Sequence, residues 1–202
     1  MSQRDAILDR LRKAPVHPVA VPDAPRPALG ADPRAQFTRR AEALHTVVEG
    51  ITDRAALPGA VARILTNNTG PLVVAPALRD LDWSDVDPCL SAPIHYGSTD
   101  GSHRVAVSEA DAAIAETGTL VLRSGPGNPT RLNFLPDLHI VLLSAEAILG
   151  HLEDFWSSIA GQDPGRVVNF ITGPSRTADI EQTIQLGAHG PRALHVLITE
   201  SP

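Results

Sequence analysis

The chain has 202 residues, of which 43% are hydrophobic and 20% charged, a composition typical of a folded globular domain rather than a disordered tail or a coiled coil. Its 17 Lys and Arg residues against 23 Asp and Glu residues give a formal net charge of -6, which argues against nucleic acid and membrane surfaces as partners. No apolar run approaches the roughly 20 residues that span a bilayer. Residues 1–13 lack the apolar core of a signal peptide, so we expect a cytoplasmic protein.

Two scarce residue types exclude several classes of site. Cys89 is the only cysteine, so this chain alone cannot hold an iron–sulfur cluster or a cysteine-rich zinc ion. Lys13 is the only lysine and falls in a predicted surface helix, which excludes a P-loop lysine, a kinase-type lysine and a buried Schiff-base lysine. The histidines show no HExxH spacing, and we expect no metal site.

The first 33 residues read differently from the rest. Ser2 is a good N-cap for a helix that ends before Pro15, with Ile7, Leu8 and Leu11 along one side. Residues 15–33 contain six of the 18 prolines, which predicts an extended, polyproline-like strap. We therefore expect a helical arm and strap over 1–33 and a single α/β domain over 34–202.

Beyond the strap, hydrophobic periodicity predicts alternating strands and helices. The predicted helices cover 33–48, 53–65, 108–115, 144–159 and 178–186, and the predicted strands cover 72–75, 92–94, 105–107, 119–122, 139–143, 167–171 and 194–198. Buried strands separated by helices of this kind favour a mostly parallel sheet flanked by helices. In such sheets ligands bind beyond the carboxyl ends of the strands.

One candidate site segment runs from Gly173 to Glu181. Ser175 or Thr177 can cap the predicted helix, and the free N–H groups of its first turn could hold a phosphate or carboxylate together with Arg176. Asp179 adds a carboxylate to that turn. The alternative is a well-capped helix with an Arg–Asp pair on its surface and no ligand.

Two further segments carry groups suited to acid–base chemistry. Glu116 could act as a general base or nucleophile at a strand mouth, beside the hydroxyls of Thr117 and Thr119 and a Gly118 that permits close backbone approach or a positive φ. His189, followed by Gly190, could be an acid–base group or an anion ligand. A helix-end glutamate and a structural turn histidine are the alternatives. Arg131, after the candidate mobile loop 123–129, is a second possible anion partner.

Four blocks in this order make the chain similar to a known family. They are AIAETGTLVL (113–122), RLNFLPDLHIVLL (131–143), GPSRTADIE (173–181) and GAHGP (187–191), and with them the chain resembles the LUD-domain family. The resemblance implies a fold similar to the sugar-phosphate isomerase and CoA-transferase-like superfamily. It places these residues in motif positions: Glu116, Thr117, Gly118, Thr119, Pro136, Gly173, Pro174, Ser175, Asp179, Ile180, Glu181, His189, Gly190 and Pro191.

The resemblance also implies a function. Family members belong to a three-protein system that oxidises L-lactate to pyruvate, in which the other two proteins look like the iron–sulfur carriers. We therefore expect an accessory subunit without a cofactor of its own, which binds a small anion such as lactate, pyruvate or a phosphate compound. Arg176 or Arg131 would hold the carboxylate, and Glu116 or His189 would take the hydroxyl proton.

Two other functions stay open at this point. The chain could be a stand-alone transferase, isomerase or cyclo-ligase that acts on a phosphate-bearing substrate, or it could be a non-catalytic scaffold. The ligand-binding hypothesis needs Glu116, Arg176 and His189 to meet in one hollow at the edge of the sheet.

Overall fold

The computed structural model describes residues 2–14, 25–65, 70–180, 183–186 and 189–200, with the backbone alone for 177–180 and 183–186. Its centre is a parallel sheet of six strands. In spatial order these are β1 (Val47–Ile51), β12 (Ala193–Thr199), β7 (Leu138–Ser144), β4 (Val105–Glu109), β2 (Leu72–Val74) and β3 (His95–Tyr96). All their carboxyl ends therefore share one edge of the sheet.

A second sheet of four strands lies beside the first. Its order is β8 (Ile148–Leu149), β5 (Ala112–Ile114), β6 (Thr119–Arg123) and β9 (Val168–Ile171), with β6 antiparallel to both β5 and β9. A separate antiparallel hairpin joins β10 (Arg176–Ile180) to β11 (Thr183–Leu186).

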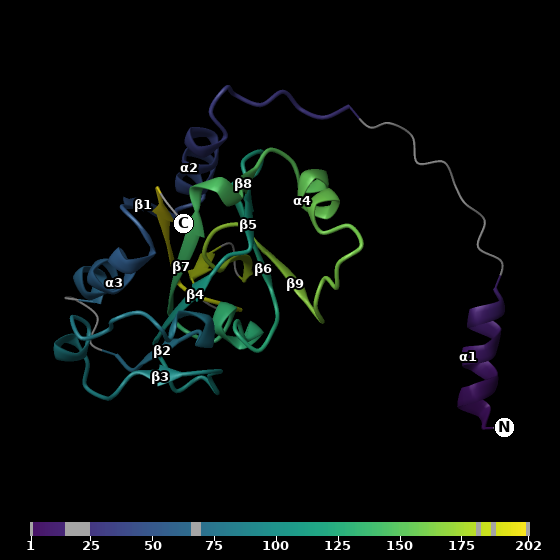
Figure 1. Ribbon diagram of the computed structural model, residues 1–202, viewed down its shortest axis with the longest axis horizontal. Coiled ribbons are helices and arrows are strands. Elements are labelled where there is room, and N and C mark those ends of the chain that lie inside the picture. The colour runs from purple at the N-terminus through teal and green to yellow at the C-terminus, as the bar shows by residue number, and fades with distance from the viewer. Residues whose placement is uncertain (1, 15–24, 66–69, 181–182, 187–188, 201–202) are drawn as a thin grey trace.

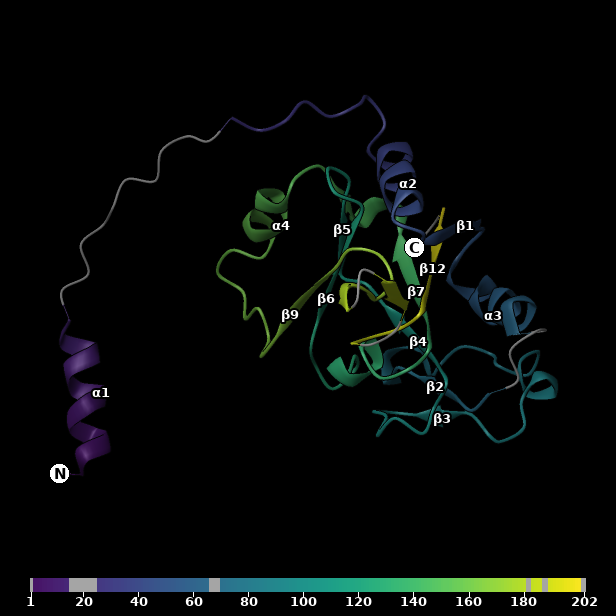
Figure 2. The same ribbon diagram turned by 180° about the vertical axis from the view of Figure 1, so that it is seen from behind.

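Two helices cover the outer faces of this pair of sheets, whereas the N-terminal helix stands apart from them (Figures 1 and 2). The helices are α1 (Gln3–Lys13), α2 (Pro33–Ala43), α3 (Leu57–Leu65) and α4 (Leu152–Ser158), and 3₁₀ turns occur at Arg54–Ala56, Pro76–Leu78, Asp87–Cys89, Thr130–Asn133 and Ala145–Ala147. Figure 1 shows α3 and α4 on opposite sides of the two sheets. No helix in the described ranges is both long and apolar enough to cross a membrane.

Three apolar clusters hold the layers together. The first packs α3 on one face of the six-stranded sheet, through Leu57, Val61 and Leu65. The second fills the space between the two sheets, where Phe37 and Ala41 of α2 meet alternate residues of β6, β7 and β12. The third packs Phe155 of α4 on the far side of β5 and β6. Because β5 and β7 are buried on both faces, the centre of the domain is rigidly positioned.

The parallel sheet and most predicted strands are confirmed. The first helix begins at the N-cap Ser2 as predicted, and none of its residues is buried. Residues 15–24 of the predicted strap lie outside the described residues. The following residues are fastened to α4, since Arg26 forms an ion pair with Asp154 at 2.8 Å and His151 contacts the Pro27 carbonyl oxygen at 2.9 Å. The division of the chain at residue 33 stays a prediction.

Two predicted helices are wrong, because both segments pair as strands despite their local capping signals. Over 108–115 the structure has the end of β4 followed by β5, and Ser108 bonds to a buried histidine instead of capping a helix. Over 178–186 it has β10 and β11. The alternation of polar and apolar residues in Thr183-Ile184-Gln185-Leu186 is the period of a strand.

Two other predicted helices are too long. Residues 144–159 form a 3₁₀ turn, the short strand β8 and finally α4. The helix predicted over 33–48 ends at Ala43, because His45 takes a left-handed conformation with φ of 64° and the chain then enters β1. Gly50 therefore lies inside β1. β3 lies at His95–Tyr96, just after the predicted 92–94.

Candidate functional site

The turn between β5 and β6 carries the predicted site segment of Glu116. Gly118 has φ of 71°, and a Cβ atom there would lie 2.6 Å from the backbone nitrogen of Ala41. Both parts of the sequence argument for Gly118 are therefore confirmed, namely a positive φ and a close backbone approach. The close approach is made to α2.

Three threonine hydroxyls form a chain beside this turn. Oγ1 of Thr119 lies 2.7 Å from Oγ1 of Thr117 and 2.8 Å from Oγ1 of Thr172. Glu116, Thr117, Thr119 and Thr172 line a cavity of about 180 Å³ whose other walls are Ile114, Leu152 and Phe170. Glu116 is the sole ionisable side chain among the described residues that line it, so the cavity offers hydroxyls and a carboxylate but no cation for an anionic ligand.

The predicted segments that contain Ser175 and His189 lie against each other. The backbone N–H of Ser175 donates to the Pro191 carbonyl at 2.8 Å, and the N–H of His189 donates to the Ser175 hydroxyl at 3.3 Å. A Cβ atom on Gly190 would touch Cβ of Ser175 at 3.4 Å. Ser175, His189 and Gly190 thus form one cluster, which is three residues along the chain from Thr172.

This cluster lies at the opposite edge of the parallel sheet from the one expected. Pro191 comes just before β12, and Gly173, with φ of 83°, packs on the carbonyl of Leu44 just before β1. Both positions are at the amino ends of parallel strands. The expectation that these loops gather at the carboxyl ends fails because residues 176–186 form a hairpin instead of a helix that crosses back.

The proposed anion partners are placed as follows. Arg176 is exposed on β10, so the helix N-terminus that was to assist it is not formed. The side chains of Thr177 and Asp179 lie outside the part of the chain that the structure describes. Arg131 lines a separate cavity with His95 and His103 and does not line the cavity of Glu116.

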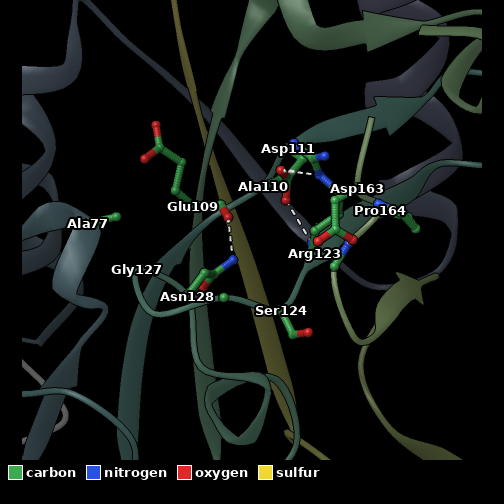
Figure 3. Close-up of a pocket in the computed structure, with 12 residues that line it drawn as sticks. Ala77, Glu109, Ala110, Asp111, Arg123, Ser124, Gly127, Asn128, Asp163 and Pro164 are labelled. Atoms are coloured by element: carbon green, nitrogen blue, oxygen red, sulfur yellow. Dashed lines mark hydrogen bonds and ion pairs between the residues drawn. The ribbon is translucent and has the colours of Figure 1, made fainter. Parts of the chain in front are cut away.

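A cavity of about 400 Å³ opens at the carboxyl edge of the six-stranded sheet. It begins where β4 ends, at Glu109, and extends to Ala77 in the turn after β2. Figure 3 shows Glu109 and Ala77 on one side of it, and Arg123, Asp111 and Asp163 on the other. This is the place where parallel α/β sheets bind their ligands.

Arg123 is held in this cavity by Asp111. Nε of Arg123 donates to Oδ1 of Asp111 at 2.8 Å, while the backbone N–H of Arg123 donates to Oδ2 at 2.7 Å (Figure 3). Both side chains are about three-quarters shielded from solvent, with 30% and 25% exposed. Within the described part of the chain, neither Nη atom of Arg123 has a hydrogen-bond partner. The guanidinium is thus fixed by one side and presents its two Nη groups, the geometry that grips a carboxylate.

The loop after β6, which the sequence marks as a mobile candidate, is fastened on both sides of the cavity. Ser124 and Val167 exchange two hydrogen bonds, of 2.8 Å from the Ser124 N–H and 2.9 Å to its hydroxyl. Asn128 donates to the Glu109 carbonyl at 2.9 Å, and its own Oδ1 is buried without a partner among the described residues.

The carboxylates around Arg123 are not equivalent. Glu109 forms an ion pair with Arg54, which also donates to the Ala77 carbonyl at 2.7 Å, and Asp111 is paired with Arg123. Asp163 accepts a hydrogen bond of 2.9 Å from the Gly165 N–H, and no arginine pairs with it among the described residues. A free carboxylate beside a fixed guanidinium suits a ligand that carries both a carboxylate and a hydroxyl.

The sequence argument missed Arg123, Asp111 and Asp163 as site residues. Arg123 is the last residue of a buried strand and is followed by the run Ser-Gly-Pro-Gly-Asn, a signal for a backbone that approaches a ligand. The pairing with Asp111 depends on the antiparallel register of β5 and β6. A helix was predicted over 108–115, so the sequence argument had no strand β5 from which to find this pairing. No group of three or more His, Cys, Asp or Glu side chains in the described ranges is placed to hold a metal ion.

Comparisons with known proteins add three findings. The family model of the LUD domain matches residues 100–199. A protein named lactate utilization protein C from Deinococcus radiodurans is 32% identical over 196 residues, which are 90% of this chain and 87% of that protein. A protein of the same name from Geobacillus is 35% identical over 102 residues, or 48% of this chain and 42% of that protein.

A solved structure has the same fold. The crystal structure of a DUF162 family protein from Deinococcus radiodurans superposes with a TM-score of 0.62, at 22% sequence identity, and covers 86% of this chain and 99% of that chain. The mostly parallel α/β architecture read from the sequence is therefore confirmed.

Proposed function

Because this chain belongs to the LUD-domain family, we propose that it takes part in lactate utilization, as an accessory subunit of an iron–sulfur-dependent system that oxidises L-lactate to pyruvate. The similarity to the Deinococcus protein along 90% of this chain is the observation that carries the proposal. The Geobacillus relative matches over 42% of its own length, so activities of the longer relatives come to this chain as proposals.

The cavity at the carboxyl edge of the sheet is the ligand site in this proposal. The carboxylate of L-lactate binds the two Nη groups of Arg123, which Asp111 holds in place. The hydroxyl of lactate faces Asp163, whose carboxylate accepts its hydrogen. A 2-hydroxy acid can contact both groups at once, because its carboxylate binds the fixed cation and its hydroxyl donates to the unpaired carboxylate.

In the proposal, the electrons from lactate pass to partner subunits. Oxidation of L-lactate to pyruvate releases an electron pair and two protons, and the iron–sulfur clusters of partner subunits accept the electrons. One cysteine, Cys89, cannot supply the thiolates of a cluster, which supports placing the clusters on the partners. Binding and orientation of the 2-hydroxy acid is the role left to this chain, and the purified chain is expected to be colourless and iron-free.

A second candidate function rests on the cavity beside Glu116. Glu116 and the linked hydroxyls of Thr117, Thr119 and Thr172 could serve a stand-alone transferase, isomerase or cyclo-ligase, as predicted from the motif. This candidate predicts turnover by the purified chain and loss of that turnover in Glu116→Gln. The third reading, a scaffold without a ligand, predicts no heat of binding for lactate, pyruvate, coenzyme A or nucleotides.

Growth on L-lactate tests the proposal in the source organism. A strain that lacks this chain is expected to grow on pyruvate and not on L-lactate, because only the oxidation step is missing. Wild-type chain and the matched surface variant Arg39→Gln should restore growth on L-lactate, whereas Arg123→Gln should not. Normal growth of the deletion strain on L-lactate would contradict the proposal.

A further inference from the structure

A second charged cavity lies next to the short edge strand β3 and shares no lining residue with the cavity of Arg123. It has a volume of about 300 Å³. Its lining includes His95, Thr99, Asp100, Ser102, His103 and Arg131. These side chains come from β3, from the loop that leads to β4, and from the 3₁₀ turn Thr130–Asn133. Segments distant in sequence thus bring two imidazoles and one guanidinium to one hollow.

The two histidine rings are stacked in this cavity. Their centroids are 4.9 Å apart and their planes differ by 26°. Nε2 of His95 lies 3.0 Å from the Ser98 carbonyl oxygen, which can only accept, so Nε2 carries a proton. Two imidazolium charges at this separation repel each other, so the second protonation is unfavourable unless a negative charge lies nearby.

The groups that contact His103 can accept hydrogen bonds from its protonated, positively charged form. Its Nδ1 lies 3.0 Å from Oγ1 of Thr99 and 3.3 Å from Oγ of Ser102. The Ser102 hydroxyl donates to Oδ1 of Asp100 at 2.6 Å, so its oxygen is left to accept from His103. Burial and the neighbouring His95 lower the pKa of His103, and Asp100 partly offsets them. His103 is therefore neutral near pH 7, while the hydroxyl oxygens beside its Nδ1 can accept a hydrogen bond from the protonated ring.

Arg131 is the permanent cation of the cavity. Its guanidinium has no ion-pair or hydrogen-bond partner among the described residues. The other charged groups nearby have partners of their own, although Asp100 stays in the lining of the cavity. Arg104 pairs with Asp137, Arg79 lies over the ring of Tyr96 at 5.2 Å, and Asp100 accepts from both the N–H and the hydroxyl of Ser102. A ligand entering the cavity thus meets Arg131 and the two histidines as its available charge partners.

We propose that His95, His103 and Arg131 form a binding site for a tetrahedral oxyanion, such as sulfate or the phosphate group of a small molecule, that fills as the histidines take up protons. The anion accepts from the guanidinium and from the imidazoles, and its charge removes the repulsion between the stacked rings. Binding and protonation are therefore coupled, and each favours the other. The inference does not depend on lactate, which the proposal above places at Arg123.

Sulfate is the probe of choice because it stays doubly charged over the tested pH range, so any pH dependence belongs to the protein. Calorimetric titration of the full chain should show binding at pH 5.5 that is about tenfold tighter than at pH 7.5, or more, since protons are taken up with the anion. Arg131→Gln should abolish binding at both pH values. His103→Asn should leave weaker binding with a smaller pH dependence, because His95 alone remains to take up a proton.

Matched controls and a second readout keep the test decisive. The exposed residues Arg39 and His45 lie outside the lining of this cavity, so Arg39→Gln and His45→Asn should bind sulfate like the wild type. Proton NMR of the wild type should show two histidine signals that shift when sulfate is added, a readout that does not depend on the stability of the variants. Equal affinity at the two pH values, or full binding by folded Arg131→Gln, would overturn the proposal.

The same cavity can take a free ion or the phosphate group of a larger molecule. Titration with glycerol 3-phosphate at pH 7.5, set against inorganic phosphate at the same pH, separates these sources. Tighter binding of the ester supports a phosphate-bearing metabolite, and equal binding supports a free anion.

Discussion

The hydroxyl of Ser108 lies 2.7 Å from Nε2 of His139, and both side chains are fully buried between the two sheets. The other ring nitrogen, Nδ1, is buried without a hydrogen-bond partner among the described residues. Burial lowers the pKa of His139 from 6.5 to about 3. The folded chain therefore keeps this ring neutral under all ordinary conditions.

The neutral His139 makes the fold sensitive to acid. The unfolded chain takes up a proton at His139 near pH 6.5 and the folded chain does not, so this contribution to stability is lost as pH falls below 6.5. From this residue we expect the free energy of unfolding to be about 2 kcal/mol lower at pH 5 than at pH 7. Urea unfolding at the two pH values measures it. His139→Gln should remove this part of the pH dependence and the exposed control His45→Gln should retain it; an identical pH dependence in His139→Gln and wild type would refute the assignment.

Gly118 should tolerate no side chain. Its positive φ and the 2.6 Å approach of a Cβ atom to the Ala41 nitrogen mean that Gly118→Ala must move α2 away from the turn. We expect a loss of at least about 2 kcal/mol in the free energy of unfolding. Gly59→Ala is the matched control: it lies inside α3 with no atom within 4 Å of an added Cβ, and should stabilise the chain by up to about 1 kcal/mol. Similar effects of the two changes would contradict the close contact.

Asp111 should act through Arg123. In Asp111→Asn the side chain can still accept from the Arg123 N–H, but the charged partner of Nε is gone and the guanidinium is free to turn. We expect L-lactate to bind about 1–2 kcal/mol more weakly, by calorimetry, with a smaller loss than for Arg123→Gln. The exposed Asp85→Asn is the control. Affinity equal to that of the wild type would mean that the ion pair has no positioning role.

Glu116→Gln separates the two candidate sites. If lactate binds at Arg123, the change should leave lactate affinity within about twofold, because Glu116 lines a different cavity. The fold should be kept, as Glu116 is partly exposed. Calorimetry on the variant measures the lactate affinity, and circular dichroism checks the fold. Loss of lactate binding with an intact fold would favour the site predicted from the motif.

The parallel sheet was predictable because its central strands are continuous apolar runs. Leu138–Ser144 and Ala193–Thr199 are buried on both faces, and such runs have few other solutions in a chain of this size. The hairpin of β10 and β11 was missed because Ser175 and Thr177 are good helix caps, while the strand period in the following residues is short. Local capping preferences do not predict whether a segment will pair with a neighbouring strand.

The candidate sites show the same division. Gly118 was recognisable, because a positive φ favours glycine whatever the tertiary contacts are. Arg123 and Asp111 are twelve residues apart, and only the register of β5 against β6 brings them together. The pair of His95 and His103 likewise depends on the loop that returns from β3 to β4. The spacing of residues within one segment cannot predict a pairing that depends on the register between two strands.

The most direct measurement is calorimetric titration of L-lactate into the wild-type chain and into Arg123→Gln, at neutral pH and low salt. The account predicts saturable binding to the wild type with one site per chain, and a loss of at least about tenfold in affinity for folded Arg123→Gln. Unchanged affinity in the variant, or no heat of binding to the wild type, would contradict the placement of the 2-hydroxy acid at Arg123.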